Sequence, residues 1–399
     1  MHHMIDPDTA LRLVLETAPT PEPAWLPLEE AAGLILAEPL RADRDYPPFP
    51  RATMDGYAVR LADAGKTLRV SGEVAAGHAW SSEFPPGTAL EIMTGAPCPA
   101  GADVVIQKER VMRQGDTVTI PPEFQMGLNI APAGSECPRD AEVVHAGDVF
   151  SPLALACAAT FGHATVRAYR LPALAIITTG DELVPVEVEP GPAQIRNSNG
   201  SMLTAMLRSI GVRDITVAHA LDTPTELEKL LQRTAAADIL LLTGAVSEGK
   251  YDSVPDALQR CGATPVFHKV TQRPGKPLFF AKRGRQLIFG LPGNPLSCHL
   301  GVHRYVTPAI WKMMGKKIER DQHCGVLGMG FSVKGPRTVF QLACAERVDD
   351  SWRVTPCLGR GSADMYSAAH ANALIRVAPG AGKMGEGIVV RFEFLDFWR

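Results

Sequence analysis

The sequence lacks the features that mark membrane, nucleic-acid-binding and zinc-ribbon proteins. Its longest apolar stretch, around Leu153 to Thr160, is too short to span a bilayer. Its 40 lysines and arginines are balanced by 43 aspartates and glutamates, so no basic field favours nucleic acid. The eight cysteines form no Cys-x-x-Cys pair, which excludes a zinc ribbon and a dithiol motif of that spacing. We therefore predict a cytoplasmic protein with free thiols and with no membrane or nucleic-acid partner.

Common nucleotide-binding and catalytic motifs are absent as well. The chain has no Walker A pattern, no Rossmann fingerprint and no nucleophile elbow. His299 and His303 have the spacing of one helix face, but no third ligand is near them in the sequence, so zinc is not favoured. With 399 residues, the chain suits roughly two to four domains.

The texture of the sequence changes along the chain. Helical patterns occur near both ends of the first 170 residues, at 6–18, roughly 27–38 and 152–161. Between them, from about 60 to 150, short apolar runs alternate with Gly, Pro and Asp turns, which predicts a small β unit inserted into a helical domain. The tail from about 321 returns to short alternating strands and predicts a small β-barrel or sandwich.

Residues 171–318 alternate between strand-like and helix-like segments. The expected strands are 173–179, 214–219, 238–243, 264–270 and 286–290, and the expected helices are 200–210, 224–236, 253–261 and 295–314. This order predicts a parallel sheet with crossover helices.

Three of these strands run directly into turns rich in glycine and polar residues. The segments are Ala173 to Leu183 (ALAIITTGDEL), Ile239 to Asp252 (ILLLTGAVSEGKYD) and Leu287 to Pro295 (LIFGLPGNP). Because open α/β sheets bind ligands at the carboxyl ends of their strands, we expect the three turns to converge on one ligand.

The first turn places two carboxylates just past a buried strand. Thr179 and Gly180 are followed by Asp181 and Glu182, and at least one of these acids is predicted to face the ligand. The alternative is a helix start, with Asp181 as N-cap and Glu182 in the first turn. Another acid, Asp222, precedes a predicted helix, where it or Thr223 would serve as the cap.

The second turn is a candidate anion cradle. Gly244, Ser247 and Gly249 would present backbone N–H groups to an anion, and Asp252 would start the next helix. The alternative is a purely structural turn. Glu248 is either a further ligand or a solvated side chain.

Two proline-flanked turns complete the candidate site. Arg273, Gly275 and Lys276 lie in an Arg-Pro-Gly-Lys-Pro turn whose cations could bind phosphate, unless the turn is simply solvated. Pro292, Gly293 and Asn294 precede a helix, where free amides and the helix dipole suit an anion; the alternative is an ordinary strand-to-helix connection. Carboxylates combined with Arg and Lys suit a phosphate-containing ligand with a hard cation such as Mg²⁺.

Motifs along nearly the whole chain resemble the MoeA family of molybdopterin molybdenumtransferases, which is similar to the E domain of gephyrin. In chain order they are MDGYAV (Met54 to Val59), IMTGAPCPAGADVVIQKE (Ile92 to Glu109), GLNI, TTGDEL, TGAVSEGKYD, RPGKP, LPGNP and GSADMYSAAHANAL (Gly361 to Leu374). Each motif is weak alone, and the set in this order is specific.

The resemblance implies a multidomain α/β plus β fold with four domains. They are a split N-terminal helical domain (1–50 and 141–170), an inserted β domain (51–140), a MogA-like α/β/α molybdopterin-binding domain with a parallel-type sheet (171–320) and a C-terminal β-barrel (321–399). It also implies a homodimer, with a cleft between the α/β domain of one subunit and the inserted domain of the other.

The resemblance further implies insertion of molybdenum, delivered as molybdate, into adenylylated molybdopterin with Mg²⁺-assisted release of AMP. The implied acidic site residues are Asp55, Glu182, Asp222 and Asp252, with Glu182 and Asp252 as metal ligands. Lys276 would bind phosphate or oxyanion, Arg273 stands where the family often has Lys, and Ser362 in the last motif would contact the cofactor. Molybdopterin adenylyltransferase and molybdoenzyme apoproteins are the implied partners.

The chain departs from the family pattern at several positions. Ala245 replaces the second glycine of the loop, and Glu248 stands where a small or apolar residue is usual. The usual Gly-Glu-Asp appears as Gly134-Ser135-Glu136, and an arginine expected near Ala131 is missing. A paralogous molybdopterin-binding scaffold, another phosphoanhydride enzyme on the same α/β domain, and a preference for tungstate over molybdate stay open at this point.

Overall fold

The computed structural model describes residues 1–244, 254–318 and 322–395, which form two compact units. The first unit comprises Met1–Ala24, Gly33–Ala37 and the chain from Arg167 onward, and the second comprises Trp25–Ala32 and Glu38–Val166. Across the described part of the chain, no helix combines the length and apolar character needed to cross a membrane.

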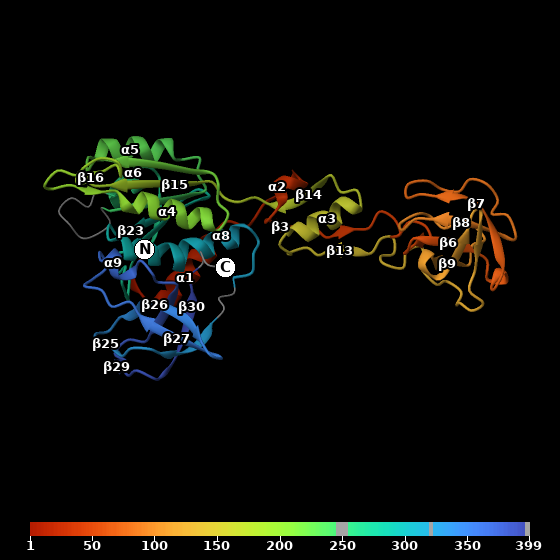
Figure 1. Ribbon diagram of the computed structural model, residues 1–399. Coiled ribbons are helices and arrows are strands. Elements are labelled where there is room, and N and C mark those ends of the chain that lie inside the picture. Colours follow the sequence, from red (N-terminus) through yellow and green to blue (C-terminus); the bar gives the residue numbers. More distant parts are fainter. Residues whose placement is uncertain (245–253, 319–321, 396–399) are drawn as a thin grey trace. The chain divides into compact units, whose positions relative to one another are not determined.

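A seven-stranded sheet forms the centre of the first unit, in the order β1-β20-β22-β23-β19-β15-β18 (Figure 1). Its strands are β1 (His2–Ile5), β15 (Leu174–Thr179), β18 (Ile215–Ala220), β19 (Ile239–Thr243), β20 (Thr264–Val270), β22 (Phe279–Arg283) and β23 (Gln286–Leu291). The predicted α/β fold class is confirmed, but the sheet is mixed. The sequence interpretation missed β22, which runs antiparallel to both β20 and β23.

Helices cover both faces of this sheet. They are α1 (Pro7–Thr17), α4 (Ser198–Ser209), α5 (Pro224–Arg233), α6 (Val254–Arg260), α7 (Pro295–Gly301), the π-helix η3 (Val302–Val306) and α8 (Thr307–Met313). Leu241 and Phe289 face a core shared with α1, α4 and the α7–η3–α8 helix, whereas Leu240 and Ile288 face α5 and α6. Alternate residues of each central strand are therefore buried on opposite faces, which explains their continuous apolar runs.

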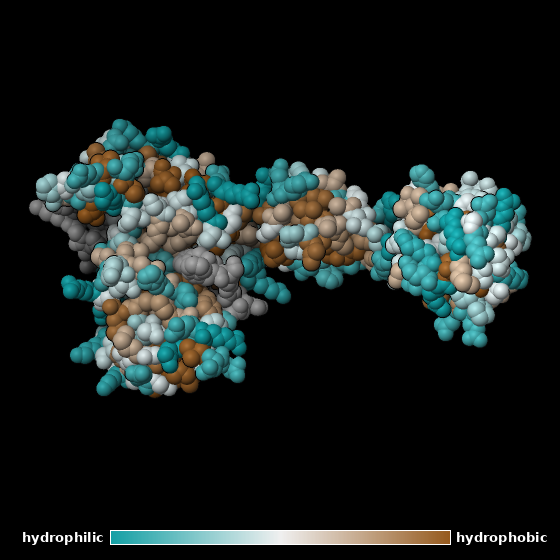
Figure 2. All heavy atoms as spheres, in the orientation of Figure 1, coloured by the Kyte–Doolittle hydropathy of each residue, from teal (hydrophilic) through white to brown (hydrophobic). Residues whose placement is uncertain are grey.

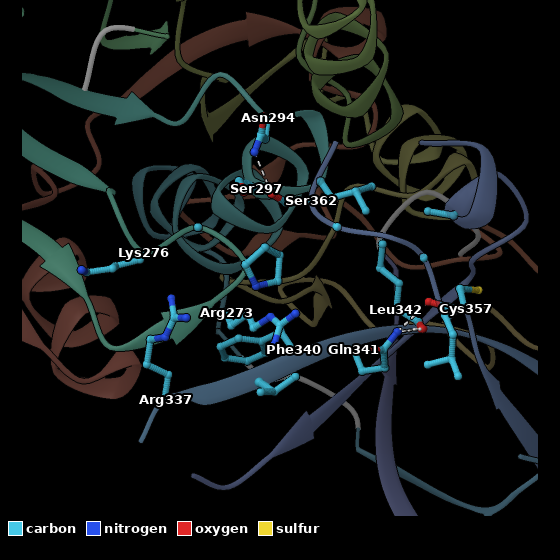
Figure 3. Close-up of a pocket in the computed structure, with 18 of the residues that line it drawn as sticks. Arg273, Lys276, Asn294, Ser297, Arg337, Phe340, Gln341, Leu342, Cys357 and Ser362 are labelled. Atoms are coloured by element: carbon cyan, nitrogen blue, oxygen red, sulfur yellow. Dashed lines mark hydrogen bonds between the residues drawn. The ribbon is translucent and has the colours of Figure 1, made fainter. Parts of the chain in front are cut away.

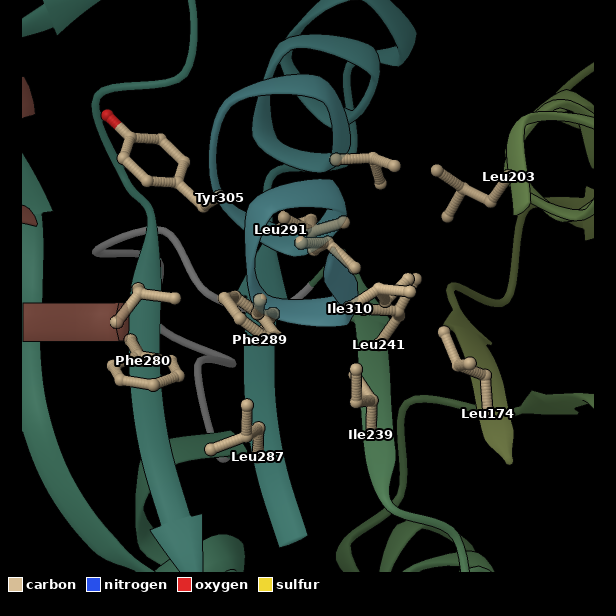
Figure 4. Close-up of a cluster of buried hydrophobic side chains, with 14 of the residues drawn as sticks. Leu174, Leu203, Ile239, Leu241, Phe280, Leu287, Phe289, Leu291, Tyr305 and Ile310 are labelled. Atoms are coloured by element: carbon tan, nitrogen blue, oxygen red, sulfur yellow. The ribbon is translucent and has the colours of Figure 1, made fainter. Parts of the chain in front are cut away.

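The first of these two cores is the larger (Figure 4). Leu174, Ile239 and Phe289 are at most 1% exposed, and each such side chain contributes about 1.5–3 kcal/mol through burial. Helix α1 belongs to this core through Ala10 and Val14, and Asp6 caps it by accepting hydrogen bonds from the N–H groups of Asp8 and Thr9.

The C-terminal strands close into a five-stranded barrel, as the sequence predicts. The strands are β24 (His323–Leu327), β26 (Thr338–Val348), β27 (Ser351–Pro356), β28 (Ala373–Val377) and β30 (Val389–Phe394). The ring closes because β26 pairs with both β27 and β28. A short strand, β21 (Gln272–Arg273), leaves the α/β sheet and pairs with β26, so the barrel and the Arg273 turn are directly connected. The barrel is accompanied by the β25 (Phe331–Val333) and β29 (Gly382–Met384) pair and by α9 (Met365–Ala368).

A six-stranded sheet, ordered β10-β11-β7-β8-β6-β9, forms most of the second unit. Its strands are β6 (Gly56–Val59), β7 (Thr67–Val74), β8 (Thr88–Ile92), β9 (Val104–Gln107), β10 (Met112–Gln114) and β11 (Thr117–Thr119). Two short ladders accompany it: β4 (Leu40–Arg41) with β13 (Glu142–Val144), and β5 (Arg51–Ala52) with β12 (Ile130–Ala131). The 3-10 turns η1 (Leu61–Asp63) and η2 (Lys108–Arg110) connect its strands.

The predicted helix at 27–38 is wrong beyond its first turn. Helix α2 covers only Leu28–Ala31, and Gly33 follows with a φ of 82°. The apolar residues after it form β3 (Ile35–Leu36), which pairs with β14 (Thr165–Tyr169) in a sheet that also contains β2 (Pro23–Pro27). The predicted helix at 152–161 is present as α3 (Pro152–Thr160), capped by Ser151.

Candidate functional site

The carboxyl ends of four central strands lie at the same level of the sheet. Thr179 of β15 is opposite Ala220 of β18, and Thr243 of β19 is opposite Leu291 of β23. The turns that follow these strands therefore meet at one edge, where the sequence predicts a ligand site.

Gly244 packs directly against Thr179 at this edge. A Cβ on Gly244 would lie 2.6 Å from Thr179 Oγ1, and its φ of 90° also requires glycine. Its N–H donates to the Leu291 carbonyl oxygen (3.2 Å). A Cβ on Gly293 would lie 3.8 Å from the Gly244 Cα, so three of the predicted turns are brought together.

The acidic turn is not a helix start. After Gly180, the chain continues into the short strand β16 (Leu183–Val184), so the N-cap alternative for Asp181 is wrong. Instead, Asp181 Oδ1 accepts a hydrogen bond from the Asp222 N–H (2.9 Å), which joins two of the predicted acids. Glu182 is exposed beside Gly180.

Helix α5 is capped by Thr223, whose Oγ1 accepts from the Glu226 N–H (3.4 Å). Asp222 is therefore not needed as the cap. Five residues of the second turn, Ala245, Ser247, Glu248, Gly249 and Asp252, lie outside the described residues, and their predicted roles stay predictions.

Two asparagines that the sequence interpretation missed organise the same edge. Asn197 caps α4 and donates from Nδ2 to Thr178 Oγ1 (2.8 Å). The buried Asn199 donates from Nδ2 to the Gly293 carbonyl oxygen (2.7 Å). The cap signal of Asn197 was readable in the sequence, whereas the bond from Asn199 spans 94 positions and was not.

A cleft of about 650 Å³ opens between the sheet-edge turns and the barrel (Figure 3). Three basic side chains line it: Arg273, Lys276 and Arg337. Within the described part of the chain, none of the three forms an ion pair. Arg337, on the segment that leads into β26, carried no motif and was missed.

The buried side-chain amide of Gln272 is hydrogen-bonded to the backbone of the turn that carries Arg273 and Lys276. Gln272, fully buried, donates from Nε2 to the Gly275 carbonyl oxygen (3.3 Å) and accepts from the Tyr305 hydroxyl. Arg337 Nη1 approaches the Gln272 carbonyl oxygen at 3.5 Å. These contacts hold the backbone of the turn that carries Arg273 and Lys276 in the lining of the cleft.

Asn294 joins the sheet edge to the barrel side of the cleft. It occupies the N-cap position of α7, but its Nδ2 donates to Ser362 Oγ (2.8 Å) and not to the helix. The Ser362 loop is ordered by Asp364, which accepts from the Arg360 and Ser367 N–H groups. These hydrogen bonds lower the pKa of Asp364 below its ordinary value, and the bond from the Arg360 N–H has the largest effect.

Asp55 lies in the second unit, on the turn between β5 and β6. Its Oδ1 accepts from both the N–H (2.8 Å) and the hydroxyl (2.7 Å) of Thr94, and Lys108 Nζ lies 3.6 Å from Oδ2. The Thr94 hydroxyl contributes most to lowering the pKa of Asp55. A Cβ on the next residue, Gly56, would lie 2.0 Å from the Ile106 carbonyl oxygen, so only glycine permits this pairing of β6 and β9.

An arginine lies beside the position, near Ala131, where the resemblance predicts an arginine. Arg51 is directly opposite Ala131 in the β5–β12 ladder. Its Nη2 donates to Glu136 Oε1 (2.6 Å), and its guanidinium lies over the Tyr46 ring. Opposite residues of an antiparallel ladder lie within about 5.5 Å, so Arg51 presents its charge next to the expected place.

The described residues do not form a metal centre on their own. They contain no group of three His, Cys, Asp or Glu side chains placed to hold an ion. Of the two predicted Mg²⁺ ligands, only Glu182 is described. The rings of His299 and His303 stack at 6.5 Å, on a helix that packs in the core.

The fold and the cleft together define a multidomain α/β protein with a cleft, lined by three basic side chains, between its sheet-edge turns and its barrel. Two family models match the chain: the MoeA N-terminal region (domain I and II) over residues 5–162, and the probable molybdopterin binding domain over residues 175–312.

Known proteins similar to this chain agree with both models. A molybdopterin molybdenumtransferase of Staphylococcus epidermidis is 34% identical, with 91% of this chain and 89% of that protein covered. That of Bacillus subtilis is 32% identical, with 98% and 95% covered. Two structures of the molybdopterin biosynthesis MoeA protein of Pyrococcus horikoshii have TM-scores of 0.83 and 0.78, at 27% and 25% identity, covering 98% of this chain and 99% or 100% of theirs. The chain belongs to the molybdopterin molybdenumtransferase (MoeA) family.

Proposed function

We propose that this protein is a molybdopterin molybdenumtransferase, which transfers molybdenum from molybdate to adenylylated molybdopterin and releases AMP. The observation that carries the proposal is the cleft, where three cations that form no ion pair with any described residue line one cavity. Cations held in this way are expected to bind an anion, and molybdate and the phosphates of the pterin are the anions of this reaction.

The residues of the cleft divide the binding task. Arg273 and Arg337 offer planar forks for the oxygens of a phosphate or oxyanion, and Lys276 offers a point charge. Asn294 and Ser362 bind each other and align the two sides of the cavity. Asn294 also belongs to the turn that meets Gly244 and Thr179, so a ligand in the cleft can extend along the sheet edge.

The proposed reaction also includes Mg²⁺. A divalent ion would stabilise the charge that develops when the phosphoanhydride breaks, and Glu182 with Asp252 would hold it. The described residues contain no complete set of ligands for the ion, so Asp252 would have to complete the site. Asp252→Asn should lose Mg²⁺-dependent AMP release; the wild-type rate across a Mg²⁺ titration would remove Asp252 from this role.

A homodimer is proposed on two grounds. Asp55 and Glu182 belong to different compact units, and a two-fold dimer would supply both to each site. Helix α3 is apolar around its whole circumference, yet Leu153 on it is 84% exposed, and brown apolar surface gathers over this part of the second unit in Figure 2. A helix apolar on every side is normally buried, so we expect a second copy to cover it.

The dimer can be tested by sedimentation at low micromolar concentration. Leu153→Asp should produce monomers, whereas Met112→Asp, at a residue 68% exposed on β10 of the same unit, should leave the dimer intact. A wild-type protein that sediments only as an active monomer would contradict the proposal.

The transfer itself is tested with the full chain, adenylylated molybdopterin and molybdate, with AMP followed by chromatography. We expect AMP release that depends on molybdate, and rescue of a cofactor-deficient cell lacking its own insertase. AMP release without molybdate would indicate another phosphoanhydride enzyme, and binding without release would indicate a scaffold. A cytoplasmic location, supply by molybdopterin adenylyltransferase and delivery to molybdoenzyme apoproteins complete the proposal.

A further inference from the structure

Two thiols lie side by side in the barrel wall of the cleft. Cys344 of β26 and Cys357, just after β27, have their Sγ atoms 3.7 Å apart, although 13 positions separate them. Both side chains are half-buried, and Cys357 lines the cavity. Neither residue is adjacent to a second cysteine in the sequence, so the pair exists only through strand pairing.

The β26–β27 ladder determines this geometry. Cys344 is opposite Thr355, and the Cys357 N–H donates to the Leu342 carbonyl oxygen (2.8 Å), which extends the ladder by one residue. Cys344 and Cys357 are therefore diagonal neighbours, and residues two apart on one strand share a face of the sheet. The Cys344 S–H donates to the His370 carbonyl oxygen (3.0 Å), which fixes its sulfur beside Cys357.

We propose that Cys344 and Cys357 form a reversible thiol–disulfide site in the wall of the cleft, oxidised by low-molecular-weight disulfides such as glutathione disulfide. Bond formation requires the two sulfurs to approach from 3.7 Å to about 2.05 Å.

The reaction proceeds by thiol–disulfide exchange in two displacements. The Cys344 thiolate attacks one sulfur of the small disulfide, forms a mixed disulfide and releases one small thiol. The Cys357 thiolate then attacks the Cys344 sulfur and displaces the second small thiol. Two cysteine thiols are oxidised by two electrons, the small disulfide is reduced to two thiols, and both cysteine protons leave with them.

The order of attack follows from the surroundings of Cys357. Burial, with the neighbouring Cys344 thiol as a second cause, raises the pKa of Cys357 to about 12, which makes it a poor first nucleophile. In the mixed disulfide Cys344 no longer carries a thiol beside Cys357, so the second cause of the raised pKa of Cys357 is removed before the second step.

The test uses the full-length protein, reduced and then exposed to glutathione disulfide at neutral pH. Digestion without reductant and mass spectrometry should find the Cys344 and Cys357 peptides linked, with two of the eight thiols lost and both restored by dithiothreitol. Cys357→Ser should instead retain glutathione on Cys344. Cys324→Ser, which removes an exposed thiol of β24, should keep the linked peptide.

Oxidation of Cys324 while Cys344 and Cys357 stay free would overturn the proposal. Glutathione on wild-type Cys344 without a link to Cys357 would overturn it as well. The wild-type peptide map needs no variant and no molybdenum transfer, so its result does not depend on the proposed activity.

Discussion

The basic side chains of the cleft in the first unit differ from Asp55 and Arg51 in the second unit in what neutralises their charge. In the first unit, Arg273, Lys276 and Arg337 line one cleft without forming ion pairs in the described part of the chain. In the second unit, Asp55 is bound by Thr94 and Lys108, and Arg51 is bound by Glu136. The comparison indicates that the first group is arranged for an external anion, whereas the second group is held by its own neighbours.

The largest effects are therefore expected in the cleft. Lys276→Ala and Arg337→Ala should each remove a charge-assisted contact worth about 1.5–3 kcal/mol, and weaken binding of the adenylylated pterin or molybdate by roughly tenfold to a hundredfold. Arg273→Lys should be milder if charge alone matters. Calorimetric titration measures the affinities.

Lys282→Ala provides the matched control, because Lys282 is exposed on β22 outside the cleft. Wild-type affinity in both Lys276→Ala and Arg337→Ala, with the fold intact, would remove the cleft from anion binding. The difference between the two units would then need another explanation.

The next prediction asks whether the sheet edge positions the cleft. Asn199→Ala leaves the Gly293 carbonyl oxygen without its buried donor, which should cost about 1–2 kcal/mol in the free energy of unfolding. Because Gly293 precedes Asn294, ligand affinity should also fall. Urea unfolding measures the stability, and calorimetric titration measures the ligand affinity. Ser201→Ala, at an exposed position of the same helix, should change neither the free energy of unfolding nor the ligand affinity.

The sequence was sufficient where the interactions are local or the apolar pattern is strong. Buried central strands such as Ile239–Thr243 carry continuous apolar runs, and the Gly and Pro turns after them fall where expected. The strand Phe279–Arg283 was missed because it follows Pro277 and ends in Lys-Arg, which are typical of a turn. The apolar residues Ile35–Leu36 joined β14 by pairing that no local pattern reveals.

The site shows the same division. Thr223 was correctly predicted among the caps, because a cap bonds three residues away. Arg337 was missed because its place beside Arg273 depends on the pairing of β21 with β26. In this pairing Gln272 is opposite Thr338, which lies 66 positions later in the chain. Thr94, the main partner of Asp55, is 39 positions from it and carries no signal of that contact.

A smaller effect is expected for the arginine of the second unit. Arg51→Ala should remove the contact with Glu136, and Ala131→Arg on the opposite strand should restore it in the double variant. The side chains of Arg51 and Glu136 are 26% and 48% exposed, so the free energy of their interaction should be about 0.2–1 kcal/mol. A double-mutant cycle on urea unfolding measures it.

The Arg44→Ala variant, which removes an exposed pair with Asp43 elsewhere in this unit, serves as the control for loss of positive charge. Failure of Ala131→Arg to improve the Arg51→Ala protein would show that the two positions are not equivalent. The arginine that the resemblance predicts near Ala131 would then have no replacement at Arg51.

The smallest effect concerns the pKa of Asp55. The Thr94 hydroxyl is the main cause of its lowered pKa, so Thr94→Val should raise that pKa toward 3.8 while the backbone N–H and Lys108 keep it below. A carboxyl group whose pKa is lowered by folding stabilises the protein at pH values above the pKa that it has in the unfolded chain. This stabilisation is lost as the pH falls through the pKa of the folded state. The stability difference between Thr94→Val and the wild type should therefore be present at pH 7 and vanish well below pH 3.8. Carbon-detected NMR titration gives the pKa, with Thr53→Val, at an exposed residue of the same turn, as the control. If the pKa of Asp55 is the same in Thr94→Val and wild type, the Thr94 hydroxyl does not neutralise this acid, and Asp55 would belong with the cleft cations as a charge arranged for a ligand.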